Sequence, residues 1–150
     1  MKHSPAHILA EYLRQGESSL GLFTDPADEG DWPLYVSSLP DGNGVPANAA
    51  AVYDTSGVKI ARLNNGTNVF QYGVQVFIRS SDYIIGHGKA SELESLLEGL
   101  LNEKVTIGEE VYVINTFNQT SPVLVLGQDP DTRRDAFTIN GLLLDRKSVV

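Results

Sequence analysis

Hydrophobic and polar residues alternate along residues 68–79, as they do in a strand with one buried face. The hydrophobic face would carry Phe70, Tyr72, Val74, Val76 and Ile78. The opposite face would carry Gln71, Gly73, Gln75 and Arg79, with Phe77 as the exception. The pattern therefore predicts a long strand with a buried hydrophobic face and a mainly polar outer face.

A leucine-rich helix is predicted to follow this strand. Its hydrophobic stripe would consist of Leu93, Leu96, Leu97, Leu100 and Leu101. Leucines at these spacings fall on one side of a helix, and burying each one stabilises the fold by roughly 1.5–3 kcal/mol before entropy is counted. The helix either begins near Asp82 or starts afresh near Ser91, where Glu94 would complete a Ser-x-x-Glu capping box.

A shorter amphipathic helix is predicted near the beginning of the sequence. Ser4 and Pro5 suit its N-cap and first turn, and Gly16 suits the position just after its end. Its hydrophobic stripe would consist of Ile8, Leu9, Tyr12 and Leu13. We expect this helix to lie on a sheet.

Short hydrophobic runs bounded by turn residues predict the remaining strands at 34–38, 110–117, 123–127 and 136–144. Residues 49–54 and 58–63 predict a hairpin, with Thr55-Ser56-Gly57 as its short loop. Loops are predicted where turn residues cluster, at 21–33, 39–46, 64–66 and 128–135. Together these elements predict an α+β fold: a single domain over residues 1–150, with a mixed, largely antiparallel sheet, two main helices packed on one face and a protruding hairpin.

The amino-acid composition is that of a globular domain and argues against a disulfide-bonded or membrane protein. Of the 150 residues, 41% are hydrophobic, a value typical of a globular domain. The absence of cysteine excludes disulfides and cysteine-ligated zinc. No hydrophobic run approaches the roughly 20 residues that span a bilayer, and residues 1–5 lack the hydrophobic core of a signal peptide. We therefore expect no membrane association and a cytoplasmic location.

The charge of the chain argues against binding to nucleic acid. Eleven basic and nineteen acidic residues give a net charge of −8, whereas affinity for the phosphate backbone comes largely from Lys and Arg. Arg133 and Arg134 form the densest basic spot in this acidic chain. They lie either in a solvated loop or at a contact with an acidic patch of a neighbouring subunit, since the Arg fork suits paired interfaces.

Candidate catalytic and metal-binding residues are few. His3 and His7 have the i, i+4 spacing that metals use on a helix, but no third ligand is nearby, which favours an exposed helix N-terminus. His87 lies between two glycines and could act as a base on a flexible loop, yet no serine or carboxylate at a suitable spacing supports this role. The acidic cluster from Asp25 to Asp31 lacks the ligand order of an EF-hand. The sequence predicts no catalytic, cofactor-binding or metal-binding residues, and a protein that is not an enzyme.

A long strand ends in Arg79-Ser80-Ser81-Asp82-Tyr83, a leucine-rich helix follows, and paired strands come next, the last containing Arg134 to Leu142. With a helix and a hairpin before them, these elements are similar in order to the tail-terminator proteins of long-tailed bacteriophages. The likeness covers nearly the whole chain and is clearest over residues 69–144. Residues 41–51 do not fit the pattern of that family.

The resemblance implies a small α+β domain that assembles as a ring, with six copies expected, on the head-proximal end of the tail tube. Such a ring stops tube growth and presents a surface to the head connector, while DNA passes through without specific binding. The implied partners are further copies of the chain, the tail tube protein and the connector. The implied location is the virion tail, and the host cytoplasm during assembly. Our candidate subunit-interface residues are Gln71, Gln75, Arg79, Arg133, Arg134 and Asp135.

Two alternatives remain open at this point. A neck or head-completion protein would contact the portal instead of the tube. A small-molecule-binding or enzymatic α+β domain would gather His87 and the acidic loops around a deep apolar cleft. A shallow surface with long loops would favour assembly.

Overall fold

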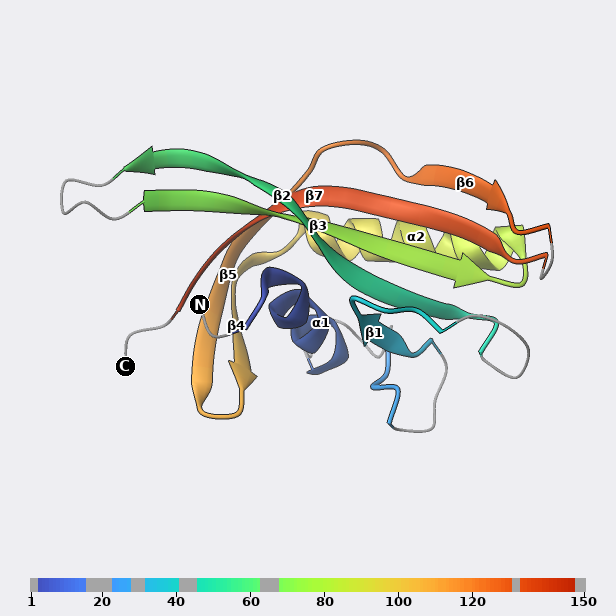
Figure 1. Ribbon diagram of the computed structural model, residues 1–150, viewed down its shortest axis with the longest axis horizontal. Coiled ribbons are helices and arrows are strands. Elements are labelled where there is room, and N and C mark those ends of the chain that lie inside the picture. Colours follow the sequence, from blue (N-terminus) through green and yellow to red (C-terminus); the bar gives the residue numbers. More distant parts are fainter. Residues whose placement is uncertain are drawn as a thin grey trace.

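The computed structural model describes residues 3–15, 23–27, 32–40, 46–62, 68–130 and 133–147. Two helices and seven strands are formed within these ranges (Figure 1). In chain order they are α1 (Pro5–Gln15), β1 (Leu34–Val36), β2 (Ala49–Arg62), β3 (Asn68–Ser80), α2 (Tyr83–Glu98), β4 (Leu101–Ile107), β5 (Glu110–Gln119), β6 (Leu124–Gln128) and β7 (Asp135–Lys147).

All seven strands belong to one sheet, in the order β1-β2-β3-β7-β5-β4, with β6 paired to β7 beside this path. The β1–β2 pair is parallel, and the others are antiparallel. One edge of β7 pairs with β3, and its other edge pairs first with β6 and then with β5. The predicted α+β fold with a mixed, largely antiparallel sheet is therefore confirmed.

Helix α1 begins where the sequence predicted. The Ser4 hydroxyl accepts a hydrogen bond of 3.2 Å from the His7 backbone N–H, as an N-cap residue does. A carboxylate oxygen of Asp54 on β2 accepts a second one, of 2.9 Å, from Ala6 N–H. Two of the first-turn N–H groups, which have no partner inside a helix, are thus satisfied. The predicted stop at Gly16 lies outside the described residues.

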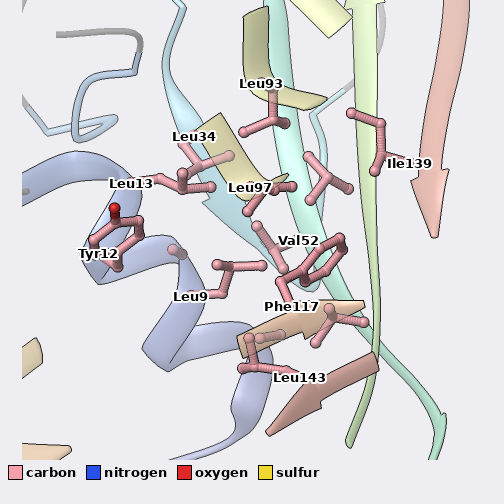
Figure 2. Packing of buried hydrophobic residues seen from close by; sticks show 14 of the residues in the cluster. Leu9, Tyr12, Leu13, Leu34, Val52, Leu93, Leu97, Phe117, Ile139 and Leu143 are labelled. Atoms are coloured by element: carbon pink, nitrogen blue, oxygen red, sulfur yellow. The ribbon is translucent and has the colours of Figure 1, made fainter. Parts of the chain in front are cut away.

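The sheet curls around α1. This helix contacts β1 and β4, which are the two ends of the strand order, as well as β2 and β3. A sheet must bend strongly for one short helix to reach both ends of it. Helix α2 packs beside it on β3, β7 and β5. Both helices share one hydrophobic core, where Leu13, Val52 and Leu97 point toward one another (Figure 2).

Helix α2 begins at the first of the two predicted positions, near Asp82. The Asp82 side chain accepts a 2.8 Å hydrogen bond from Ile84 N–H, so it is the N-cap, and a fresh start at Ser91 is wrong. Leu93 and Leu97 are buried on α2 as predicted, whereas Leu100 is buried but lies beyond the end of the helix.

The helix does not extend to Leu101. It ends at Glu98 with Gly99 as its C-cap, and Leu101 is the first residue of β4, with 63% of its surface exposed. Including Leu101 in the helical stripe was wrong, and the strand that it begins was missed. The strands predicted at 34–38, 110–117, 123–127 and 136–144 are confirmed as β1, β5, β6 and β7.

The predicted hairpin around Thr55-Ser56-Gly57 is also wrong, because this segment continues a single strand. β2 pairs with β3 on both sides of it: Thr55 pairs with Gly73, and Val58 pairs with Gln71. Three steps along β2 match two steps along β3, so the segment is a bulge with one extra residue. A Cβ atom on Gly57 would lie 2.5 Å from the Gln71 carbonyl oxygen, so the close backbone approach at this bulge favours glycine.

A protruding hairpin does exist, and β2 and β3 form it. These two strands extend together beyond the rest of the sheet at one end of the molecule (Figure 1). Arg62 still pairs with Asn68 at the far end of the pair. The turn predicted at 64–66 lies outside the described residues.

Candidate assembly surface

A groove of about 530 Å³ lies on the face of the sheet that is turned away from the helices. Its lining residues come from β2, β3, β6, β7 and two loops: Leu39, Tyr53, Gln75, Phe77, Arg79, Leu126, Gly127, Gln128, Asp129, Arg134 and Ala136. The alternation of β3 explains the position of the groove. Val74, Val76 and Ile78 point into the core, so Gln75, Phe77 and Arg79 must point outward.

Arg79 is held firmly within this surface. Only 6% of it is exposed, and its two terminal nitrogens donate hydrogen bonds of 2.5 Å to the Pro40 carbonyl and 2.6 Å to the Pro46 carbonyl. These prolines lie on either side of residues 41–45, which are outside the described residues. The guanidinium fork thus fastens the chain to the sheet at Pro40 and at Pro46.

Arg134 reaches the groove from the β6–β7 connection. Arg133 N–H donates a 2.8 Å hydrogen bond to the Asp129 carbonyl, and Asp129 N–H donates a 2.9 Å hydrogen bond to the Arg134 carbonyl. Arg133 has a φ of 56°, a left-handed conformation that turns the chain back on itself. The turn leaves Arg133 exposed and Arg134 half-buried beside Gln128 and Asp129.

The structure brings together three of the six candidate interface residues. Gln75, Arg79 and Arg134 line the groove, and Arg133 lies on the exposed loop next to it. Gln71 is eight residues before Arg79 on β3, which puts it roughly 26 Å away along the strand. Asp135 pairs with Ser80 and, by alternation with buried Phe137, lies on the helix side of the sheet.

The chemistry of the groove suits contact with a polypeptide. Two guanidinium groups, one carboxylate and two side-chain amides lie among Leu39, Tyr53, Phe77 and Leu126. Guanidinium and amide groups can donate hydrogen bonds to backbone carbonyls or carboxylates, while the apolar side chains can bury apolar surface. Phe77 was the one residue that broke the predicted alternation, and in the structure it contributes this apolar character.

A hydrophobic surface that the sequence did not reveal lies beside the groove. Strand β6 exposes Leu124, Val125 and Leu126 to 44%, 48% and 55%, and the first turn of α2 exposes Tyr83, Ile84 and Ile85 to 48%, 79% and 50%. Consecutive hydrophobic residues at 124–126 are typical of a buried strand, so the pattern gave no sign of this exposure.

The structure places His3 and His7 at the start of α1 and His87 on α2. His3 and His7 are half-buried, not exposed as predicted, because the His3 ring lies with its Nδ1 atom 2.8 Å from the Tyr112 hydroxyl. The His7 ring lies edge-on to the His3 ring, with centroids 5.1 Å apart, and its Nε2 atom is 3.7 Å from a Glu11 carboxylate oxygen. His87 is on α2, not on a flexible loop, and its ring stacks on Tyr83 with centroids 5.9 Å apart.

Within the described ranges, no group of three or more His, Asp or Glu side chains is placed to hold a metal ion. The Asp25–Asp31 cluster is described only as far as residue 27, so most of it lies outside these ranges. Neither α1 nor α2 has the length and apolar character needed to cross a membrane.

Residues 18–136, which are most of the chain, match the family described as bacteriophage tail terminator protein. The chain belongs to this family. The match begins after α1 and ends within β7, so it includes the groove, β6 and the loop with Arg133 and Arg134. Among curated proteins, none matches the sequence. Membership in the tail terminator family makes this a structural protein of the phage tail, with other tail components as its partners.

Proposed function

We propose that this protein caps the head-proximal end of the phage tail tube as a ring, stops tube polymerisation and provides the joining surface for the head connector. The family match over residues 18–136 carries the proposal. The groove and the exposed hydrophobic residues beside it support it further, because surfaces of this kind mark protein–protein contacts.

A closed ring requires each subunit to offer two different surfaces. Contacts related by rotation are heterologous, so one surface of a copy meets another surface of the next copy. We assign the groove with Gln75, Arg79 and Arg134 to one of these surfaces, with Arg133 beside it. Gln71 and Asp135 complete the set of candidate interface residues; Gln71 lies toward the protruding end of β3, and Asp135 lies on the helix side of the sheet. Six copies are expected in the ring.

Charge supports a ring through which DNA passes. The chain carries a net charge of −8, and an acidic lining would let the phosphate backbone pass without binding it. Assembly would take place in the host cytoplasm, and the finished ring would remain in the virion tail.

The decisive experiment combines purified tail tube subunits with this protein. We expect tubes of limited length with the protein and overlong tubes without it. Equal tube lengths in both mixtures would refute the capping function.

Particles assembled in cells without the protein test the neck alternative. Overlong or headless tails would agree with termination. Full heads that leak DNA would assign the protein to head completion instead.

An enzymatic or small-molecule-binding role receives less support from the geometry. That alternative placed His87 and the acidic loops around a pocket, but His87 does not line the groove. The groove is instead lined by Arg, Gln and hydrophobic side chains with one carboxylate, Asp129, and this mixture suits a polypeptide partner.

A further inference from the structure

The far ends of β2 and β3 form a two-stranded arm, residues 58–62 and 68–71. β3 pairs with β7 only from Tyr72 onward, and β1 pairs with β2 only at residues 50–52. Both outer edges of the arm therefore have no pairing partner among the described strands. A two-stranded ribbon is marginally stable in water without a third strand or a packed helix. A partner that pairs with one of these edges would therefore stabilise the arm.

The opposite end of the molecule carries an open strand edge (Figure 1). Within the described sheet, β6 pairs with β7 alone, so one edge of Leu124–Gln128 has free backbone N–H and C=O groups. Native proteins usually block such edges with charged side chains, proline or a covering element. β6 has exposed hydrophobic residues at 124–126 instead.

Exposed hydrophobic residues lie on both faces of β6. Val125 pairs with Phe137 of β7, and the Tyr83 ring lies 5.5 Å from the Phe137 ring, so Val125 is on the side of the sheet where the first turn of α2 exposes Ile84 to 79%. Leu126 instead lines the groove on the other side of the sheet. A surface of this kind on a soluble protein marks a docking site.

Charge indicates which partner suits the arm. Residues 55–72 contain Lys59 and Arg62 and no acidic residue, so the segment carries +2. With a total of −8, the rest of the chain carries −8 − 2 = −10. A basic arm therefore suits a second copy of this acidic chain, and it reduces the repulsion between copies that are otherwise alike in charge.

We propose that the arm of one copy lies along β6 of the next copy and adds a strand to its sheet. Backbone hydrogen bonds to the open edge of β6 would hold the strand, and the hydrophobic residues at 83–85 and 124–126 would be covered. The arm and β6 lie at opposite ends of the molecule, so the contact is head-to-tail and can continue around a ring (Figure 1). The inference rests on the proposed ring and names the segments that close it.

The absence of cysteine allows a direct test by cross-linking. One variant carries Asn68→Cys at the arm, and a second carries Leu126→Cys on β6. They are mixed with tube subunits and treated with a bifunctional thiol reagent whose flexible spacer tolerates small differences in register. We expect a cross-linked dimer of the two variants. The matched control is Leu101→Cys, because Leu101 is 63% exposed and lies on β4. Three results would overturn the proposal. Asn68→Cys could cross-link to Leu101→Cys as strongly as to Leu126→Cys, it could cross-link to the tube protein instead, or it could form no cross-link.

The variant Leu126→Lys tests whether the contact is needed to control tube length. A lysine on an edge strand opposes the addition of another strand. We expect Leu126→Lys to lose control of tube length while its unfolding temperature stays close to that of the wild type, and Leu101→Lys to retain control. Retained control in Leu126→Lys would count against the arm contact.

The outcomes separate this inference from the proposed function. If the wild type limits tube length but the 68–126 cross-link does not form, the ring stands and the arm contact is wrong. If the wild type fails to limit tube length, the capping function is wrong. Cross-linking of the concentrated protein alone then decides whether the arm binds β6.

Discussion

Replacing Arg79 by alanine separates its two possible roles, as a subunit contact or as an internal clamp. Arg79 is 6% exposed, and its guanidinium group donates hydrogen bonds to two carbonyls. Hydrogen bonds from a charged donor contribute about 1.5–3 kcal/mol each, so the pair has an upper limit of roughly 3–6 kcal/mol. Pro46 is exposed, and its carbonyl would regain water in the variant. We therefore expect Arg79→Ala to lower the free energy of unfolding by about 2–4 kcal/mol.

Denaturant-induced unfolding followed by circular dichroism measures this loss, provided that the slope of the unfolding free energy against denaturant concentration is the same in the variant and the wild type. Arg133→Ala is the matched control, because Arg133 is exposed, and its unfolding free energy should stay within about 0.5 kcal/mol of the wild type. Arg79→Lys should be intermediate, since one ammonium group does not reproduce the fork that reaches both carbonyls. A change below about 0.5 kcal/mol in Arg79→Ala would refute the clamp and favour the subunit contact.

Three further predictions concern α2 and the basic loop. Leu97→Ala should lower the free energy of unfolding by about 2–5 kcal/mol, because Leu97 is 1% exposed in the shared core. Thermal and denaturant unfolding would measure this loss, and a loss below about 1 kcal/mol would contradict the packing. Asp82→Ala removes the N-cap of α2 and should cost about 1 kcal/mol, with Asp82→Asn as the control that keeps the cap. The double charge reversal Arg133→Glu/Arg134→Glu should abolish control of tube length and leave the fold intact, while Lys104→Glu on β4 should have no effect; unchanged tail length and infectivity in the double variant would exclude this loop from the interface.

Local sequence patterns correctly predicted the elements in which neighbouring residues alone decide which side chains are buried. The alternation along β3 identified its core face correctly, because Val74, Val76 and Ile78 alternate with outward-facing residues on a strand covered by helices on one side only. Capping chemistry likewise placed the start of α1, and it gave the start of α2 as one of two possible positions. These features depend on residues within a few positions of one another.

One error arose where the outcome depends on a distant segment. Thr55-Ser56-Gly57 has the composition of a turn, but whether it turns or bulges is decided by its pairing with residues 71–73 of β3. The other error was local: leucines at helical spacing continue to Leu101, but Gly99 ends the helix, and the polar run at 102–104 gave β4 little hydrophobic signal.

The candidate surface was predictable only in part, because it also depends on distant segments. Gln75 and Arg79 were expected on the outer face of β3, and they are there. Their meeting with Arg134 depends on β7 lying between β3 and β6, which no local pattern reveals. The buried position of Arg79 depends on the carbonyls of Pro40 and Pro46, more than thirty residues away along the chain.

The position of β7 in the sheet also bears on how the chain is made. This strand pairs with β3, β6 and β5, and all three precede it in the sequence. A ribosome therefore releases three strands with open edges before the strand that joins them emerges. Pairings between distant segments form slowly, and open edges in nascent chains favour aggregation. High yields of this protein should thus depend on slow synthesis or on a chaperone that shields those edges until residues 135–147 have left the ribosome.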